Sequence, residues 1–509
     1  MMMGLYDNNF YTVAARNALC YGDRDAWFDE QKGSSVGFTR FFDLSASLAG
    51  GLRQAGVKKG DRVAVLGKNR VEYFLVFGAA AALGAVVVPI NWRLSAEEIA
   101  FNINDAGCSV LFLDGEFAEM VKEIEGRLES IGLYLGLDGE IDGYRSVQSV
   151  MTGDGSSFEA TDVAMDDDFV IIHTAAVAGH PRGAVLSHGN VLFANMHFAY
   201  FFGLGPDDVH LSVLPLFHVG GLFMATAAFH AGAMNVNMAK FDGARAAELI
   251  EEKRVSFMMD FTPMLAGILD EHDKSGRDLS SLRAVTGLES PETIERYQRV
   301  AGGTFWSMYG QTETSCLATF GRYDDRPGSA GRPLPLADVR LFDDYDRPVP
   351  AGQVGEICMR GPMVFKGYWN LPEDNAGTFR EGWHHTGDTG RFDEDGFLWY
   401  AGRKAEKELI KPGGENVYPA EVEKTILLHP AVEEVVVFGV PDPKWKEGIK
   451  AVCRLKKGHV LEEKDLIEFV GGRIARYKKP QYVEFIEEFP TIEDGTIDRA
   501  ETRRRYGGS

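Results

Sequence analysis

Short apolar runs bounded by polar residues recur from the N-terminus to residue 403, and patterns typical of helices fall between them. The runs that predict strands include Arg62–Leu66, Val110–Leu113, Phe169–Ile172 and His210–Leu214. The segments that predict helices include Arg245–Lys253 and Thr293–Val300. Alternation of strands and helices is typical of α/β proteins with largely parallel sheets. We therefore predict a large N-terminal region of stacked α/β sheets.

The segment Tyr73–Ile90 is an apolar run close to the length that spans a membrane. Its first part, Phe74–Leu83, is rich in alanine and predicts a buried helix. Gly84 suits the residue that follows a helix end, and Val86–Val88 predicts a buried strand. We expect a helix, a turn and a strand here, and a membrane span is the alternative.

Composition changes near residue 403, where the densely charged stretch Arg403–Lys411 leads into Pro412-Gly413-Gly414. A charged stretch that ends in this way is typical of an interdomain hinge. The remaining residues predict a compact α+β domain with helices Ala420–Leu428 and Glu463–Ile474 and strands Glu434–Val440, Lys450–Leu455 and Val483–Ile486. We predict an N-terminal domain over residues 1–403, a hinge over 404–408 and a small, mobile C-terminal domain over 409–509.

Length and charge narrow the classes of function. A chain of 509 residues is too long for one core. Its net charge of −22 repels nucleic acid and anionic membranes, so we expect neither as a partner. The five cysteines are scattered and form no CxxC pair, so we expect no disulfide framework, no zinc site and a reducing cytoplasmic location. The first residues lack a basic region followed by an apolar run, so no signal peptide is expected.

Four short polar motifs follow one another in the second half of the chain. They are Tyr309-Gly310-Gln311-Thr312-Glu313, Gly387-Asp388, Gly402-Arg403 and Gly413-Gly414-Glu415-Asn416. Tyr309 offers a ring on which adenine can stack, and Thr312 offers a hydroxyl for a phosphate oxygen. Glu313 is a hard oxygen ligand suited to Mg²⁺, which neutralises charge when a carboxylate attacks a phosphate. The motifs predict activation of a carboxylate by ATP, and a Tyr-Gly turn with a capping Thr-Glu is the alternative.

Nearly the whole chain, from residue 10 to 506, resembles the adenylate-forming superfamily of acyl-CoA synthetases, nonribosomal-peptide adenylation domains and luciferases. The resemblance rests on the four motifs, on Leu214–Gly221 and on Tyr477–Pro480. It implies an N-terminal AMP-binding domain that makes an acyl-adenylate from a carboxylate, ATP and Mg²⁺. It also implies a C-terminal domain that rotates before the acyl group passes to a thiol, here coenzyme A.

The resemblance implies roles for individual residues. Nucleotide-binding residues are expected at Thr174, Gly179, Arg182, Tyr309, Gly310, Gln311, Thr312, Asp388 and Arg403. Residues at the acyl group are expected at His218, Val219, Gly220, Thr262, Gly287 and Leu288. Residues near coenzyme A are expected at Trp445, Tyr477, Lys478 and Lys479. Catalysis is expected to depend on Thr312, on Glu313 as the metal ligand, on His218 and on position 496.

Several of these roles have alternatives. His218 can be a structural histidine, and residues 477–479 can form an exposed basic turn beside a packing Trp445. The adjacent His384 and His385 are a possible metal pair by residue type. Neighbours on a strand point to opposite faces, however, so we expect no metal on this pair.

Two departures from the family pattern concern charge and hydrogen bonding. In the phosphate loop His173–Gly183, Ala175–Ala178 replaces hydroxyl residues and a glycine, which removes side-chain donors while backbone N–H donors remain. Thr496 stands where the family has a lysine that bridges the carboxylate and the α-phosphate. The candidate substitutes for that positive charge are Arg499, Lys478 and Lys479.

Two further departures concern shape. Two extra residues follow Arg403 in the hinge, and Glu408 is the candidate pivot. Leu288 adds bulk where a small residue is common in the family, which predicts a narrowed or reshaped acyl pocket.

Three functions stay open from the sequence. The first is an acyl-CoA ligase for a fatty, aromatic or alicyclic monocarboxylic acid. The second is an acyl-adenylate synthetase that loads a carrier protein, which the CoA-type loop at 477–479 disfavours. The third is a catalytically impaired relative that binds nucleotide or acyl-CoA, which Thr496 favours and the retained Tyr309, Glu313 and Asp388 disfavour. The acyl chain and the oligomeric state are open, with a homodimer as one alternative.

Overall fold

The computed structural model describes residues 7–507 except 152, 154, 156–157, 178–179, 344, 404–408, 416 and 492–496. The chain divides into two compact units. The first unit is Met1–Trp92, Ile103–Ile172 and Gly183–Gly402, and the second is Arg93–Asn102, His173–Arg182 and Arg403–Ser509. The α/β class predicted from the sequence is confirmed, whereas the exact domain boundaries and the hinge stay predictions.

The largest sheet has nine strands in the order β16-β15-β14-β13-β12-β10-β11-β1-β2 among the described residues. The strands are β1 (Asp25–Asp29), β2 (Ser34–Gly37), β10 (Val209–Ser212), β11 (Met234–Asn237), β12 (Phe257–Phe261), β13 (Ala284–Leu288), β14 (Thr304–Tyr309), β15 (Thr319–Arg322) and β16 (Arg332–Pro333). The central strands β10 to β14 pair in parallel. Their carboxyl ends therefore meet at one edge of the sheet.

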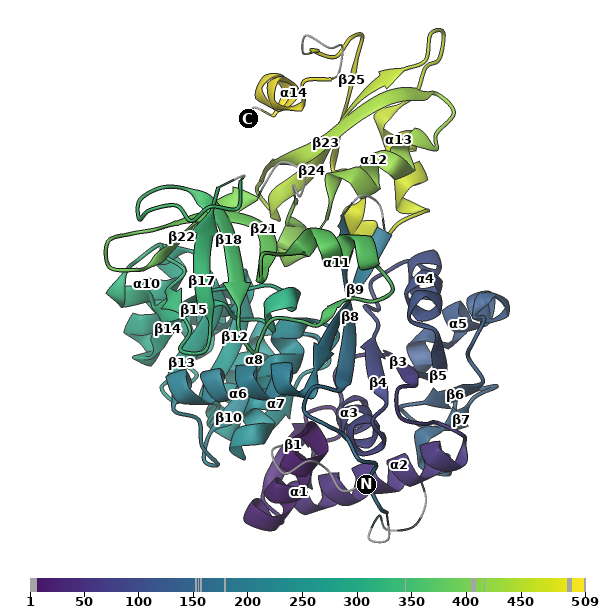
Figure 1. Cartoon of the computed structure of the whole chain (residues 1–509), viewed down its shortest axis with the longest axis vertical. Coiled ribbons are helices and arrows are strands. Elements are labelled where there is room, and N and C mark those ends of the chain that lie inside the picture. Colours follow the sequence, from purple (N-terminus) through teal and green to yellow (C-terminus); the bar gives the residue numbers. More distant parts are fainter. Residues whose placement is uncertain are drawn as a thin grey trace. The chain divides into compact units, whose positions relative to one another are not determined.

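A second sheet has eight strands in the order β19-β9-β8-β4-β3-β5-β6-β7. The strands are β3 (Arg62–Leu66), β4 (Val86–Pro89), β5 (Cys108–Leu113), β6 (Leu133–Gly136), β7 (Arg145–Ser146), β8 (Asp168–Val177), β9 (His180–Ser187) and β19 (Gly367–Tyr368). Figure 1 shows β8, β4, β3 and β5 side by side. A smaller sheet follows in the chain, with strands β17 (Asp338–Phe342), β18 (Gly355–Arg360), β20 (Phe379–Arg380), β21 (Trp383–Phe392) and β22 (Leu398–Arg403).

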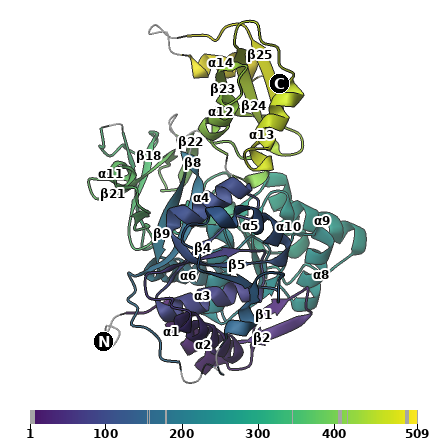
Figure 2. The same cartoon turned by 90° about the vertical axis from the view of Figure 1, so that its right-hand side faces the viewer.

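Helices cover the sheets of the first unit and fill its core. They are α1 (Phe10–Tyr21), α2 (Phe38–Gln54), α3 (Val71–Leu83), α4 (Ala96–Ala106, which enters the second unit), α5 (Ala118–Ile124), α6 (His188–Phe202), α7 (Val219–Ala231), α8 (Gly243–Lys253), α9 (Met264–Ser275), α10 (Pro291–Ala301) and α11 (Pro372–Thr378). Figure 2 shows α1, α2 and α3 close together. Every residue of α3 is buried, as expected of a helix that is apolar all round.

The apolar run at 73–90 forms the helix, turn and strand that its composition predicts. Helix α3 ends at Leu83, and Gly84 takes the left-handed conformation with φ 72°. Strand β4 then begins at Val86 and pairs with β3 and β8 in the core of the eight-stranded sheet. Among the described residues, none of the helices combines the length and the apolar character needed to cross a bilayer.

The second unit contains a three-stranded sheet in the order β23-β24-β25. Its elements are α12 (Pro419–Leu427), β23 (Val432–Asp442), β24 (Lys446–Leu455), α13 (Glu463–Gly471), β25 (Tyr482–Ile486) and α14 (Arg499–Tyr506). Buried residues of α12, α13 and the sheet form its apolar core. All five elements predicted for this domain are present, and their ends differ by a few residues at most.

Candidate active site

The carboxyl ends of three neighbouring parallel strands carry sequence-predicted residues. Thr262 follows β12, Leu288 ends β13 and Tyr309 ends β14. Phe261 pairs with Leu288 across β12 and β13, and Thr286 pairs with Trp306 across β13 and β14. This edge is where ligands bind in open α/β sheets. The fold thus brings the predicted acyl residues and the predicted adenine residue to one edge.

Asp388 is the centre of a buried hydrogen-bonded cluster. The Tyr309 hydroxyl donates to its Oδ2 at 2.8 Å, and the Gln311 amide donates to the same oxygen. Tyr400 donates to Oδ1 at 3.4 Å, and its ring stacks on Tyr309 with centroids 6.0 Å apart. Burial, and then the Asp388 carboxylate, raise the pKa of Tyr309 well above its usual value, so this hydroxyl stays a donor. The cluster fixes an aromatic ring beside a carboxylate.

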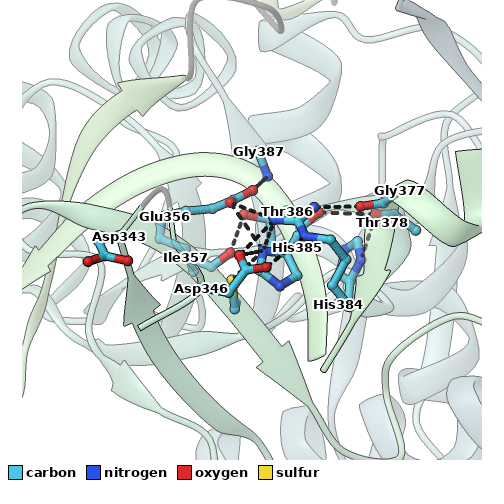
Figure 3. A network of polar contacts seen from close by, with 12 residues as sticks. Asp343, Asp346, Glu356, Ile357, Gly377, Thr378, His384, His385, Thr386 and Gly387 are labelled. Atoms are coloured by element: carbon cyan, nitrogen blue, oxygen red, sulfur yellow. Dashed lines mark hydrogen bonds and ion pairs between the residues drawn. The ribbon is translucent and has the colours of Figure 1, made fainter. Parts of the chain in front are cut away.

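Asp388 is positioned by its neighbours on β21. The backbone N–H of Gly387 donates to Glu356 Oε1 at 3.0 Å, and the Thr386 hydroxyl donates to the Ile357 carbonyl at 2.6 Å. Figure 3 shows Glu356, Ile357, Thr386 and Gly387 in this arrangement. Both partners lie on β18, so the strand pair β18–β21 holds the backbone on which Asp388 sits.

The motif that follows β14 is a tight, buried turn. A Cβ on Gly310 would lie 1.9 Å from the Cys316 carbonyl oxygen, so glycine is required there. Residues Thr312–Thr314 form one 3₁₀ turn, which Gln311 caps. Glu313 is buried, and its Oε1 accepts a hydrogen bond from the Tyr368 hydroxyl at 2.7 Å. A carboxylate held in this way by a neutral donor keeps the oxygen chemistry that Mg²⁺ prefers.

His218 caps the helix that follows the predicted acyl segment. Its Nδ1 accepts a hydrogen bond from the backbone N–H of Gly220 at 3.2 Å, and α7 begins at Val219. Its ring also lies edge-on to Phe261, with centroids 5.9 Å apart. His218 therefore has a structural role whatever it does at the acyl group. A Cβ on Gly220 would lie 2.8 Å from Met259 Sδ, which explains the small residue.

Thr262 and Leu288 are linked across the ends of β12 and β13. The Thr262 hydroxyl donates to the Leu288 carbonyl at 2.8 Å. Gly287 has φ 146°, and a Cβ there would lie 1.8 Å from the Asp260 carbonyl oxygen. The Leu288 side chain is 55% exposed at the strand end. This leucine is placed where it can contact a ligand at the sheet edge.

The phosphate-loop segment is described only in part. Strand β8 ends at Val177, and strand β9 begins at His180. The Thr174 hydroxyl donates to the Arg182 carbonyl at 3.3 Å. Gly179 lies outside the described residues. The same is true of two other predicted positions, Glu408 and Thr496. Their predicted roles stay predictions.

In the second unit, the Pro412-Gly413-Gly414 turn lies against Trp445. The backbone N–H of Gly413 donates to the Trp445 carbonyl at 3.2 Å, and a Cβ on Gly413 would lie 2.8 Å from the indole ring. The Trp445 ring is exposed. Arg403 donates to the Tyr418 hydroxyl at 3.0 Å. Trp445 therefore packs on the turn and still presents a face to solvent.

Two of the three candidate substitutes for the family lysine are occupied by carboxylates. Lys478 is buried, with its ammonium 2.6 Å from Glu421 and in contact with Glu98. Burial by itself would lower the pKa of Lys478, but these two carboxylates outweigh burial and raise it. Arg499 pairs with Glu423 at 2.7 Å. Among the residues that the structure describes, Lys479 makes no ion pair with any carboxylate.

Two residues of this site were not predicted from the sequence. They are Tyr368, which holds Glu313, and Tyr400, which stacks on Tyr309. Tyr368 lies 55 residues from Glu313 in the sequence, which is too far for a local pattern to connect them. Tyr400 lies within an ordinary strand, β22. The proximity of Tyr400 to Gly402-Arg403 is the one signal that pointed to it.

Comparison with known proteins gives two family matches. The model of the AMP-binding enzyme matches residues 14–369, and the model of the AMP-binding enzyme C-terminal domain matches residues 421–495. A feruloyl-CoA synthase from Amycolatopsis sp is 35% identical over 484 residues, which are 93% of this chain and 95% of that protein. An indoleacetate–CoA ligase from Aromatoleum aromaticum is 35% identical over 476 residues, which are 92% and 93% of the two chains.

A solved structure agrees with these matches. The crystal structure of a putative long-chain-fatty-acid CoA ligase from Rhodopseudomonas palustris is 44% identical, with a TM-score of 0.75. The match covers 79% of this chain and 100% of that chain. The fold, the sequence motifs and the matches to known proteins therefore agree with one another.

Proposed function

The chain belongs to the AMP-binding enzyme family, and on this premise we propose that it is an acyl-CoA ligase of the AMP-forming type. The substrates are a monocarboxylic acid, ATP and coenzyme A, and the products are acyl-CoA, AMP and pyrophosphate. The observation that carries the proposal is the buried cluster of Tyr309, Gln311 and Asp388 beside Glu313. It brings together an aromatic ring proposed for adenine, a carboxylate proposed for ribose and an oxygen ligand proposed for Mg²⁺, from the end of β14 and from β21.

The reaction has two steps in this family. In the first, a carboxylate oxygen of the acid forms a bond to the α-phosphorus of ATP, and the bond to pyrophosphate breaks. In the second, the sulfur of coenzyme A forms a bond to the carbonyl carbon, the thiol proton is released, and AMP leaves. Asp388 is proposed to hold the ribose and Tyr309 the adenine through both steps, because both groups are fixed by buried hydrogen bonds.

Glu313 is the residue that would hold Mg²⁺. Its carboxylate is buried and supported by the Tyr368 hydroxyl, which orients it without supplying a competing charge. When bound, Mg²⁺ supplies positive charge that offsets the charge of the phosphates. Thr312 precedes Glu313 in the same turn and is proposed to donate its hydroxyl to a phosphate oxygen.

We propose aromatic monocarboxylic acids as the first substrate class and fatty acids as the second. Two relatives at 35% identity are named for an aromatic acid, feruloyl and indoleacetate, and a third protein of known structure for a long-chain fatty acid. The exposed Leu288 at the end of β13 is proposed to contact the acid. A flat ring packs on such an aliphatic side chain with little loss of conformational entropy.

A second candidate function is a relative that binds nucleotide and acyl-CoA with a slow adenylation step. Thr496 lacks the charge of the family lysine. Lys478 and Arg499, which are two of its three candidate substitutes, are held by Glu421, Glu98 and Glu423. This observation favours slow adenylation and leaves thioester formation from a supplied acyl-adenylate unaffected.

Incubation of the full chain with MgATP, coenzyme A and a panel of acids tests both candidates. The panel contains cinnamic, indoleacetic, benzoic, cyclohexanecarboxylic and saturated fatty acids, and mass spectrometry reads acyl-CoA and AMP. Acyl-CoA from an aromatic acid supports the proposal and its substrate class. AMP binding without acyl-CoA from any acid, but with acyl-CoA from a synthetic acyl-adenylate, supports the second candidate.

A further inference from the structure

A cluster of metal-ligating side chains lies on one face of the strand pair β18–β21, separate from the nucleotide residues. Cys358 on β18 stands directly opposite His385 on β21, and Glu356 precedes Cys358 by two residues. The pairing of β18 with β21 shifts register between Glu356 and Cys358, and the side chains of all three residues still converge on one point. Cys358 is 0% exposed, His385 2% and Glu356 5%. Figure 3 shows Glu356, His385 and Asp346 pointing toward one another.

The distances in this cluster are those of ligands around one ion. His385 Nδ1 lies 3.2 Å from Cys358 Sγ and 3.1 Å from Glu356 Oε2, and all three ligand atoms lie within 4.8 Å of one another. Tetrahedral zinc with bonds of about 2.0–2.3 Å separates its ligand atoms by roughly 3.3–3.6 Å. The two distances from His385 Nδ1 are within a few tenths of an ångström of this range, so the cluster is close to the dimensions of a coordination shell on the histidine side.

The hydrogen-bonding capacity of His385 Nδ1 is exceeded by its neighbours. Arg380 Nη2 lies 2.8 Å from this nitrogen, in addition to the thiol and the carboxylate. An imidazole nitrogen carries either one proton or one lone pair. If it accepts from Arg380, it cannot also accept a proton from Cys358 or donate one to Glu356. A cation at this point satisfies the nitrogen, the sulfur and the carboxylate at once.

The structure offers a fourth ligand and a route to solvent on the same side. Asp346 Oδ1 lies 3.8 Å from His385 Nδ1 and is bridged to the cluster by Arg380 at 3.0 Å. The side chains of Arg380 and Asp346 are 38% and 28% exposed. Arg380 also lies 3.7 Å from Glu356. A positive guanidinium thus stands at the solvent side of three anionic or lone-pair ligands, in the place that an entering cation would take.

We propose that Glu356, Cys358 and His385, completed by Asp346, bind a thiophilic divalent cation, with Zn²⁺ as the best fit. Cysteine, histidine and carboxylate together select zinc over magnesium or calcium, which take oxygen ligands. Binding displaces the Arg380 guanidinium toward solvent. The thiol proton of Cys358 is released to water as the sulfur binds the metal as a thiolate.

This inference revises the expectation of no zinc site only in part. The expectation of no zinc site came from the scattered cysteines, and the proposal departs from it because Cys358 is one of the proposed ligands. A separate argument concerned His384 and His385 as a pair, and these two do have different partners. His384 Nδ1 lies 3.2 Å from the Thr378 hydroxyl and its ring packs edge-on against Phe365. The proposed ligands instead come from three segments that span residues 346 to 385, a spacing that no CxxC-type motif shows.

A metal titration of the chelator-treated full chain tests the proposal. Co²⁺ is added first, because a thiolate ligand gives a charge-transfer absorption that nitrogen and oxygen ligands do not. Zn²⁺ is then added to displace it and to measure affinity. We expect one equivalent of Co²⁺ with a thiolate band in the wild-type chain, and a rise in melting temperature with Zn²⁺. Absence of the band in the wild-type chain overturns the proposal without need of any variant.

Three variants assign the band to this cluster. Cys358→Ser is expected to abolish it and to weaken zinc binding about 100-fold, whereas Cys20→Ser, which changes the exposed cysteine, leaves both unchanged. Arg380→Gln is expected to strengthen binding about tenfold because the competing charge is gone. Circular dichroism verifies that each variant is folded. A band that survives in Cys358→Ser, or that disappears in Cys20→Ser, overturns the assignment, as does weaker binding in a folded Arg380→Gln chain.

Discussion

The nucleotide residues of the first unit and the basic residues of the second unit differ in how their charges are used. Asp388 accepts hydrogen bonds from Tyr309, Gln311 and Tyr400, all of them neutral donors. Lys478, by contrast, already has two carboxylates as partners. Because these three donors are uncharged, they orient the Asp388 carboxylate without neutralising it. In the second arrangement the positive charge of Lys478 is neutralised inside the protein, although the resemblance implies that this lysine lies near coenzyme A.

This difference shows that a residue that matches a family motif can be used in two ways, for a ligand or for the fold. In the first unit, the residues proposed to bind nucleotide lie together with side chains that hold them in place. The second unit retains the residue types Tyr477, Lys478 and Lys479, but the middle one has an internal role in the structure. A motif that matches by residue type can therefore serve stability and not ligand binding, and only the contacts distinguish the two.

The largest effect is expected from Lys478→Met. The change leaves Glu98 and Glu421 buried together without their common cation, which costs about 3–5 kcal/mol. Hydrogen exchange of the α12 amides measures the loss as easier opening of that helix. The matched control is Lys479→Met, which changes a lysine without an ion pair among the described residues and is expected to stay within about 0.5 kcal/mol. Equal effects of both changes would break the comparison.

Asp388→Ala is expected to weaken AMP binding roughly 100-fold. The change removes a buried carboxylate whose charge-assisted hydrogen bonds contribute about 1.5–3 kcal/mol each. Isothermal titration with AMP gives the affinity. Asp395→Ala, at an exposed aspartate that pairs with Arg326, is the control and should bind AMP normally. Normal AMP affinity in Asp388→Ala would remove this residue from the nucleotide site.

Glu313→Gln is expected to lower the rate of pyrophosphate release about 30-fold and to raise the Mg²⁺ concentration needed for half-maximal rate. The amide keeps the size of the side chain and can still accept from Tyr368, so the fold of the turn is preserved. A coupled pyrophosphate assay across a Mg²⁺ series measures both quantities. Tyr368→Phe is expected to give a smaller loss of the same kind, because the carboxylate remains but is less well held. An unchanged Mg²⁺ dependence in Glu313→Gln would contradict the assignment.

Thr496→Lys is expected to speed adenylation about tenfold, the smallest of the four effects. A single fixed donor at such a site contributes about 3–4 kcal/mol, of which one substitution recovers a part. Pyrophosphate release before addition of coenzyme A isolates this step. Lys479→Ala in the wild-type background sharpens the comparison, since a loss of rate there identifies Lys479 as the existing substitute. No gain from Thr496→Lys together with a loss from Lys479→Ala would show that the missing charge is already replaced.

Most of the fold followed from local patterns in the sequence. The apolar run at 73–90 and the five elements after residue 418 were predictable because periodicity and glycine placement act over a few residues. The predicted strand at 210–214 is shorter in the structure. It ends at Ser212, because the chain turns at Val213, whose N–H bonds to the Leu211 carbonyl. Such a turn next to Pro215 leaves no signature in apolar character.

The motifs of the candidate site could be read from the sequence, whereas the residues that hold them in place could not. Tyr368 reaches Glu313 from 55 residues away, and Lys478 meets Glu98 across 380 residues. No local pattern encodes contacts of that range. The cluster around His385 was missed for the same reason, since its ligands are brought together by the pairing of β18 with β21 and by the turn that carries Asp346.

The pair Gly287 and Leu288 has a consequence for how this protein can change. Gly287 admits no side chain, because a Cβ would lie 1.8 Å from a backbone oxygen, whereas Leu288 next to it is mostly exposed. Position 287 therefore accepts only glycine, whereas position 288 tolerates other side chains. With the proposed role of residue 288 at the acid, selection for a new acid can vary this residue widely at almost no cost to folding. A library at that single codon is an economical starting point for engineering the substrate range.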